Sequence, residues 1–177
     1  MIGIVGPALA SYLVGSLPIA RLVPPARQAG VSPPWVRVAL VVADVLKGAV
    51  AMSLIGSSAN PYAQSMVATA VVAGHQWPFW PSARDELGLA VAAGALTVVT
   101  PIAVPVWAVL WGIGYVTSGF VAAGSAAATL LFPVVIGLLA GWPFALGSLP
   151  VCALVLERLR APLRRILAGE EPKHHWR

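Results

Sequence analysis

The sequence has few charged residues for its length. Only 10% of its 177 residues are charged, 59% are hydrophobic, and the mean hydropathy is +0.86. Soluble domains usually carry about 25% charged residues, and a globule of this size could not hide so much apolar surface from water. We therefore expect an integral membrane protein, with lipid as the solvent around most of the chain.

Cysteine is nearly absent, and histidine is scarce. Cys152 is the single cysteine, and the three histidines are His75, His174 and His175. One cysteine has no partner for an intrachain disulfide bond, and the cysteine and histidine sets that usually bind zinc cannot be assembled. We predict no metal site and no cofactor.

Acidic residues are also scarce, six against eleven Lys and Arg, so the formal net charge is +5 and the isoelectric point is about 10.2. Such a charge can indicate nucleic-acid binding. Here, however, the basic residues gather at the ends of apolar runs, and six of them lie close to the C-terminus: Arg158, Arg160, Arg164, Arg165, Lys173 and Arg177. This placement is typical of anchoring against anionic lipid head groups, so we expect membrane lipids and no nucleic acid as partners.

Seven apolar runs follow one another along the chain. They fall at about 2–23, 36–55, 62–75, 88–100, 102–117, 122–140 and 142–157. No basic residue precedes the first run, which therefore predicts a span rather than a cleaved signal peptide. We expect an all-α integral membrane protein, a polytopic helical bundle of about seven transmembrane spans. Merging runs across the weak joins at Pro101 and Gly141 would leave five spans as the alternative.

The charged connections between runs predict the orientation of the chain. With seven spans they fall on one side of the membrane, and the uncharged joins fall on the other apart from the neutral 118–121 turn. The positive-inside rule then places the N-terminus outside and the C-terminus in the cytoplasm. We predict a multi-pass plasma-membrane protein with a transmembrane helical domain over residues 1–157 and a basic cytoplasmic tail over residues 158–177.

Two opposite charges, Asp44 and Lys47, interrupt the second apolar run. Residues three apart lie on one helix face and can form an ion pair. A charge at the bilayer centre costs about 2.5–3.5 kcal/mol on insertion scales, so it is normally kept for a function. We favour a polar active cavity, with both side chains facing the interior of the bundle. A structural ion pair with Lys47 reaching toward the interface is the alternative.

Two further features lie near the ends of apolar runs. His75 follows Gly74 at the end of the third run, and histidine changes its charge near neutral pH, which suits proton transfer; a structural role at the interface is the alternative. In the first run, Gly15, Ser16 and Pro18 predict a broken helix, which lipid tolerates only where the break is buried or lines a cavity. A simple proline kink is the alternative there.

Five short motifs lie in order along nearly the whole chain. They are YLVGSLPIARLV in the first run, DVLKG at Asp44–Gly48, GHQWPFW at Gly74–Trp80, YVTSG at Tyr115–Gly119 and RRILAGEEPK at Arg164–Lys173. Together they resemble the motifs of the acyl-phosphate-dependent glycerol-3-phosphate acyltransferases of bacterial plasma membranes. The resemblance implies a helical membrane enzyme, usually of seven spans. It would move an acyl group from acyl phosphate to glycerol 3-phosphate and make lysophosphatidic acid for phospholipid synthesis.

The resemblance and the intramembrane charges together give a set of candidate site residues. The catalytic candidates are His75, Ser16 and Thr117. The substrate-binding candidates are Arg37, Asp44, Lys47, Gly48, Gly74, Arg84, Arg158, Arg160 and Arg164. In the expected mechanism the glycerol phosphate hydroxyl attacks the acyl carbonyl, cations such as Lys47 and Arg84 neutralise the phosphates, and His75 is available as the base.

The chain departs from the family pattern in its loops. The Asn-rich loop of the family is PPARQAGVSPPW here, with no asparagine, and its Gly-Gly-Lys-Gly stretch is Asp85-Glu86-Leu87-Gly88. The family's histidine and asparagine near the tail fall on Leu159 and Pro162. We favour the acyltransferase. A catalytically silent relative acting as a binding or assembly subunit, and a small transporter, are the alternatives.

Overall fold

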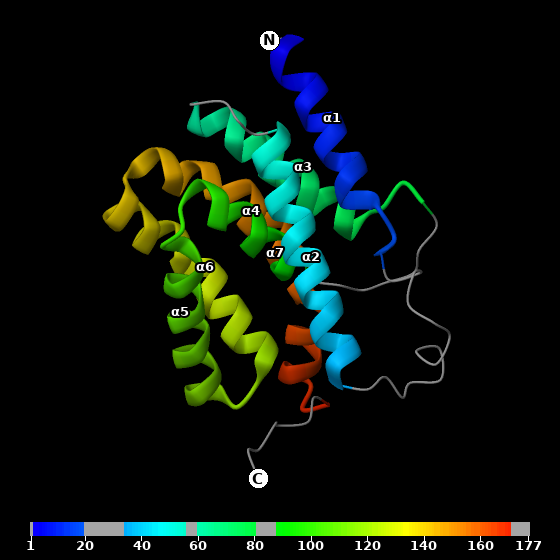
Figure 1. Cartoon of the computed structure of the whole chain (residues 1–177). Helices are drawn as coiled ribbons and strands as arrows, with labels where there is room; N and C mark the ends of the chain where they lie inside the picture. Colours follow the sequence, from blue (N-terminus) through cyan, green and yellow to red (C-terminus); the bar gives the residue numbers. More distant parts are fainter. Residues whose placement is uncertain (1, 20–33, 56–59, 81–87, 171–177) are drawn as a thin grey trace. The chain divides into compact units, whose positions relative to one another are not determined.

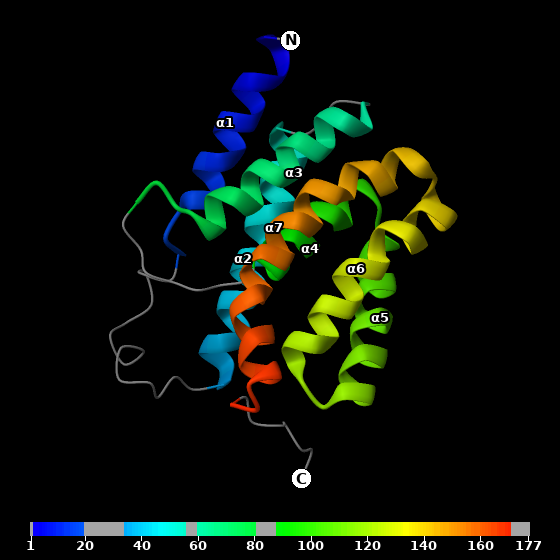
Figure 2. The same cartoon turned by 180° about the vertical axis from the view of Figure 1, so that it is seen from behind.

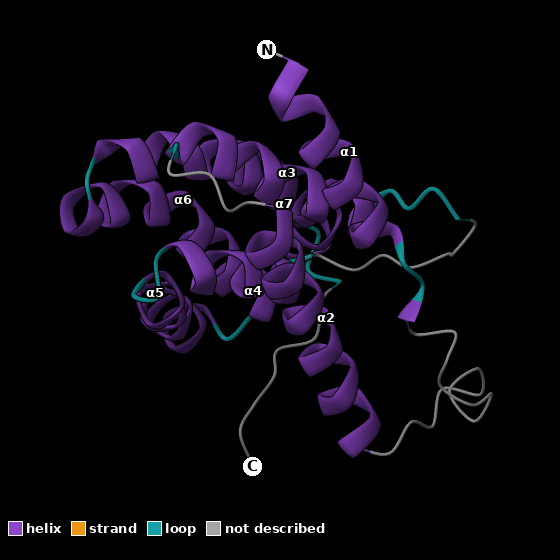
Figure 3. Ribbon diagram, turned by 45° about the horizontal axis from the view of Figure 1, so that its top comes forward, coloured by secondary structure: helices purple, strands orange, loops and turns teal. Residues whose placement is uncertain are grey.

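The computed structural model describes residues 2–19, 34–55, 60–80 and 88–170, and all regular structure within them is helical (Figures 1 and 3). The helices are α1 (Ile2–Ser16), α2 (Pro34–Ile55), α3 (Pro61–Gln76), α4 (Leu89–Val99), α5 (Ala103–Ser118), α6 (Val121–Ala140) and α7 (Trp142–Leu167). Each helix coincides with one of the seven predicted apolar runs. The expectation of an all-helical chain is confirmed for the described residues.

Helices α1 and α7 differ most from the predicted runs. α1 ends at Ser16 because Pro18 lacks a backbone N–H and disfavours helical geometry at Leu17. Helix α1 is therefore broken before Pro18, and residues 20–23 of the predicted run lie outside the described residues. α7 instead continues to Leu167, so the predicted tail begins within a helix.

Among the described residues, two helices, α6 and α7, contain an apolar stretch long enough to cross a membrane, and α4 and α5 are shorter apolar helices. The join at Gly141, between α6 and α7, is a true helix boundary. Gly141 has φ 102°, a conformation that favours glycine and ends the helix. The number of spans stays a prediction.

The chain divides into two compact units, residues 1–99 and 100–177. In the first unit, α1 packs against α3 and α2 packs against α4. Both pairs approach closely because glycines face the neighbouring backbone: a Cβ on Gly15 would overlap the carbonyl of Val71, and one on Gly94 would overlap that of Val45. Small residues of this kind let helices pack through van der Waals contact in lipid.

In the second unit, α6 packs against both α5 and α7 (Figure 2). Gly114 of α5 and Gly124 of α6 lie against each other, so a Cβ on Gly114 would come within 3.0 Å of the Gly124 Cα. The Trp111 ring stacks on Tyr115, and its indole Nε1 donates to the Ser125 hydroxyl at 3.2 Å. These contacts tie α5 to α6 through two turns of helix.

Candidate active site

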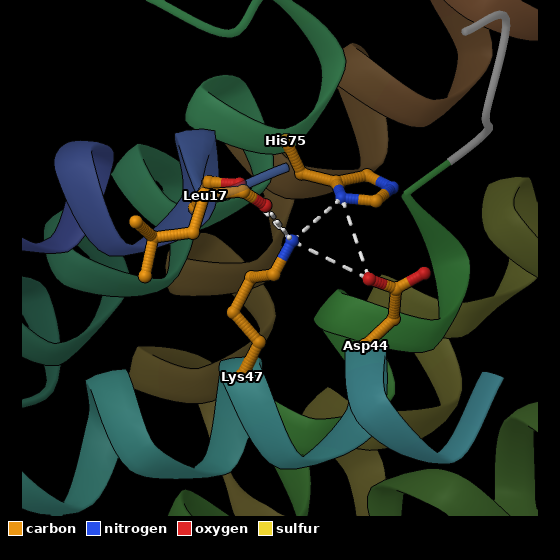
Figure 4. Close-up of polar contacts among 5 residues, drawn as sticks. Leu17, Asp44, Lys47 and His75 are labelled. Carbon is orange, nitrogen blue, oxygen red and sulfur yellow. Dashed lines mark hydrogen bonds and ion pairs between the residues drawn. The ribbon is translucent and has the colours of Figure 1, made fainter. Parts of the chain in front are cut away.

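A buried polar cluster lies where α1, α2 and α3 meet, and Lys47 is at its centre (Figure 4). The Lys47 Nζ lies 3.4 Å from the Asp44 Oδ1 one turn earlier in α2. The side chain of Lys47 is 3% exposed and that of Asp44 16%. The predicted ion pair, and its orientation toward the protein interior, are confirmed.

Lys47 also caps the C-terminal end of α1. Its Nζ donates to the carbonyl of Leu17 at 3.1 Å and to that of Gly15 at 3.3 Å. The last carbonyls of a helix have no partner within the helix, and they form the negative end of its dipole. The buried Lys47 ammonium group donates hydrogen bonds to these carbonyls, and its positive charge interacts favourably with the dipole. Lys47 therefore stabilises the helix end that Pro18 creates.

His75, near the C-terminal end of α3, completes the cluster. Its Nδ1 lies 3.4 Å from the Lys47 Nζ and 3.8 Å from the Asp44 Oδ1, and its side chain is 9% exposed. His75 is therefore part of a buried three-residue group, and its catalytic or structural role stays a prediction. The DVLKG and GHQWPFW motifs contribute the three polar side chains of this group.

Ser16 is buried beside this cluster, and its hydroxyl is used within α1. The Ser16 Oγ donates to the Tyr12 carbonyl at 2.8 Å, one turn earlier. Such back-bonding is common for serine in helices. The catalytic role of Ser16 stays a prediction.

Gly48 and Gly74 allow two helix crossings at the edges of the cluster. A Cβ on Gly48 would overlap the carbonyl of Val91 in α4, and a Cβ on Gly74 would overlap that of Tyr12 in α1. Close backbone packing explains both glycines. Their predicted contact with substrate stays a prediction.

The remaining candidates that the structure describes belong to the second unit. The Thr117 hydroxyl donates to the carbonyls of Ile113 and Gly114 at 2.9 and 3.2 Å, within α5. On α7, the Arg160 Nη1 lies 2.7 Å from the Glu157 Oε2 in an exposed pair. Arg164 is exposed and Arg158 is half-buried on the same helix.

Two predicted cations cannot be placed. Arg37 lies in α2, but its side chain is outside the described part, and Arg84 lies wholly outside the described residues. Within the described ranges, no three histidine, cysteine or acidic side chains gather as metal ligands.

Residues 5–169 match the family model described as glycerol-3-phosphate acyltransferase. The chain belongs to this family. A glycerol-3-phosphate acyltransferase of Thioalkalivibrio sulfidiphilus is 31% identical over 93% of this chain and 91% of its own length. The glycerol-3-phosphate acyltransferase 2 of Moorella thermoacetica is 32% identical over 73% of this chain and 68% of its own. The resemblance inferred from the motifs is confirmed.

Two crystal structures of PlsY, an integral membrane glycerol 3-phosphate acyltransferase, share the fold. The glycerol 3-phosphate form has a TM-score of 0.79 at 20% identity, covering 97% of this chain and 96% of that chain. The lysophosphatidic acid form has a TM-score of 0.80 at 22% identity, covering 97% and 95%. The present chain thus has the helical fold of this membrane acyltransferase family.

Tyr12 begins the first motif, but it is not among the predicted site residues. Its hydroxyl donates to the carbonyl of Trp77 at 2.7 Å, which ties α1 to the residue that ends α3. Ser11, its neighbour, donates to the Val67 carbonyl of α3 at 2.9 Å. The available signal was spacing: Tyr12 lies one helical turn before Ser16 and so faces the same neighbour.

Proposed function

We propose that this protein is a membrane acyltransferase that moves an acyl chain from acyl phosphate to glycerol 3-phosphate, giving lysophosphatidic acid for phospholipid synthesis. The observation that carries the proposal is the buried Asp44–Lys47–His75 cluster, built from two family motifs in a chain that matches the family over residues 5–169. The two PlsY structures, in glycerol 3-phosphate and lysophosphatidic acid forms, support the same substrate class.

The reaction requires charge neutralisation and positioning more than acid catalysis. A hydroxyl oxygen of glycerol 3-phosphate attacks the acyl carbonyl carbon, a new ester bond forms, and the carbon–oxygen bond to phosphate breaks. The electron pair leaves with phosphate, which is a good leaving group, and the hydroxyl proton passes to a base, for which the sequence suggests His75. Cations and hydrogen-bond donors fixed in place supply most of the stabilisation in such transfers.

Turnover by the purified full-length chain tests the function directly. In detergent, with acyl phosphate and labelled glycerol 3-phosphate, we expect labelled lysophosphatidic acid, and none when acyl phosphate is omitted. Folded protein that binds glycerol 3-phosphate but forms no product would instead support a silent relative.

The charged residues Arg84, Asp85 and Glu86 are expected to affect phosphate binding in opposite directions, Arg84 strengthening it and the two carboxylates weakening it. Losing a charge-assisted contact to phosphate costs about 1.5–3 kcal/mol, or roughly 10- to 150-fold. Arg84→Ala should therefore weaken turnover at least about tenfold, mainly through the KM for glycerol 3-phosphate. The matched variant Asp85→Asn with Glu86→Gln removes two negative charges and should lower that KM, most visibly at low salt. Unchanged KM in both variants would mean that phosphate binds elsewhere.

We also propose seven spans, with the N-terminus outside and the C-terminus in the cytoplasm. The 11 residues of α4 rise only about 16 Å at 1.5 Å per residue, so this span needs residues beyond the helix or a locally thin bilayer. The cluster of basic residues from Arg158 onward supports the cytoplasmic placement of the C-terminus.

A reporter fused after Arg177 is expected to show cytoplasmic activity. As a control, the same reporter inserted at residues 57–60, an uncharged join, should report from the other side of the membrane. Activity after Arg177 only in the periplasm would overturn the orientation.

A further inference from the structure

Tyr12 contacts the residues on both sides of His75. Its hydroxyl donates to the carbonyl of Trp77, two residues after His75, at 2.7 Å. Its backbone carbonyl lies against Gly74, the residue before His75, where an added Cβ would overlap it. Both contacts join α1 to the C-terminal end of α3 (Figure 1). His75 therefore lies between two points at which a single residue of α1 holds α3.

The Trp77 carbonyl marks the point where the chain leaves α3. Pro78 lacks a backbone N–H and disfavours helical geometry at the residue before it. Trp77 accordingly has φ −127° and ψ 75°, outside the helical region, while its N–H still donates to the Ala73 carbonyl of α3. The Tyr12 hydroxyl binds the carbonyl of the same residue. Both polar backbone groups of Trp77 are thus held, and the direction in which the chain leaves α3 is set beside α1.

The C-terminal end of α1 is in turn joined to α2. The Lys47 Nζ donates to the carbonyls of Gly15 and Leu17 at 3.3 and 3.1 Å, and it lies 3.4 Å from the His75 Nδ1. Figure 4 shows Lys47 reaching from α2 to the carbonyl of Leu17 and to His75. Helix α1 is therefore linked to α2 through Lys47 and to α3 through Tyr12. The position of His75 relative to Lys47 depends on both links.

We infer that Tyr12 is a positioning residue for His75. Its hydroxyl holds the C-terminal end of α3 against α1 and so keeps the His75 ring beside Lys47 and Asp44. The kinetic part of this inference rests on the proposed acyltransferase function, in which the sequence suggests His75 as the base, and the positional part does not. Placement of such a group matters because a shift of about 1 Å can reduce a rate about 100-fold.

Ser11 allows this role to be separated from the general packing of α1 on α3. The buried Ser11 hydroxyl donates to the Val67 carbonyl at 2.9 Å. This bond is of the same type and joins the same two helices as the bond from Tyr12. Val67, however, lies about two helical turns before His75, whereas Trp77 lies just after it. Loss of the Ser11 bond should therefore weaken the packing without releasing the backbone next to His75.

Kinetics of Tyr12→Phe in the full-length chain test the role. The substitution removes one oxygen and keeps the ring. We expect kcat to fall at least about fivefold while the KM for glycerol 3-phosphate changes less than about threefold, because the chemical step depends on where His75 lies.

Two variants are matched controls for the kinetics. Ser11→Ala removes the other hydroxyl contact between α1 and α3. Tyr62→Phe makes the same chemical change at an exposed residue near the start of α3. Both should keep kcat within about twofold of the parent value. Equal losses of kcat in Tyr12→Phe and Ser11→Ala would overturn the inference, as would an unchanged kcat or a change in KM alone for Tyr12→Phe.

NMR of the His75 ring tests the positional part without an assay. Replacing His174→Gln and His175→Gln leaves His75 as the single labelled histidine in a full-length chain. We expect Tyr12→Phe to shift the ring signals of His75, and both control variants to leave them in place. Unmoved signals in Tyr12→Phe would overturn the inference. So would an unfolded Tyr12→Phe protein, because the contact would then serve the fold as a whole. A shift of the signals in a protein without turnover refutes the proposed function alone.

Discussion

Replacing Lys47 by methionine is expected to lower the free energy of unfolding by about 3–5 kcal/mol, the usual cost of removing one partner of a buried ion pair. The reason is the set of groups that the substitution leaves unpaired. Asp44, 16% exposed, would lose its counter-ion, and the carbonyls of Gly15 and Leu17 would lose their donor. Denaturant unfolding in detergent, followed by circular dichroism, measures the change.

Two variants show whether the unpaired carboxylate causes this loss. The double variant Asp44→Asn with Lys47→Met removes both charges, and it should recover part of the stability that Lys47→Met loses. Glu157→Gln breaks the exposed ion pair between Glu157, 47% exposed, and Arg160, 69% exposed. This substitution should lower the free energy of unfolding by less than about 1 kcal/mol. Equal losses for the buried and the exposed pair would contradict the central role of Lys47.

Gly74→Ala is expected to destabilise the first unit and to lower turnover sharply. Alanine normally improves a helix by about 0.5–1 kcal/mol relative to glycine. Here, however, the added Cβ would overlap the Tyr12 carbonyl, which is backbone and cannot move aside alone. Overpacking of this kind costs about 1–3 kcal/mol. Because His75 is the next residue, a shift of about 1 Å could reduce turnover about 100-fold.

Gly6→Ala is the matched control, since Gly6 lies in α1 and a Cβ there would meet nothing within 4 Å. It should leave thermal stability and turnover unchanged or slightly raise stability. The two variants are compared by thermal unfolding and by the acyl-transfer assay. If Gly74→Ala behaved like Gly6→Ala, close packing of α1 on α3 would not be the contact that holds His75 in place.

Local sequence determined the positions of the helices, two of their ends and the Asp44–Lys47 pair. Apolar runs predicted all seven helices of the described residues, because a segment in lipid must satisfy its backbone groups internally and therefore becomes helical. Pro18 and Gly141 ended α1 and α6 through their own backbone geometry. Asp44 and Lys47 paired as predicted because residues three apart share a helix face.

Only the tertiary structure decided how the candidate site is connected. Lys47 and Gly15 are separated by 32 positions and Tyr12 and Trp77 by 65, and no local rule predicts such contacts. The close backbone packing of Gly74 and Gly48 against neighbouring carbonyls likewise arises only where α1 packs on α3 and α2 packs on α4. The contacts of the His75 Nδ1 with Lys47 and Asp44 are also set by where three helices cross, which is a property of their packing rather than of any one segment.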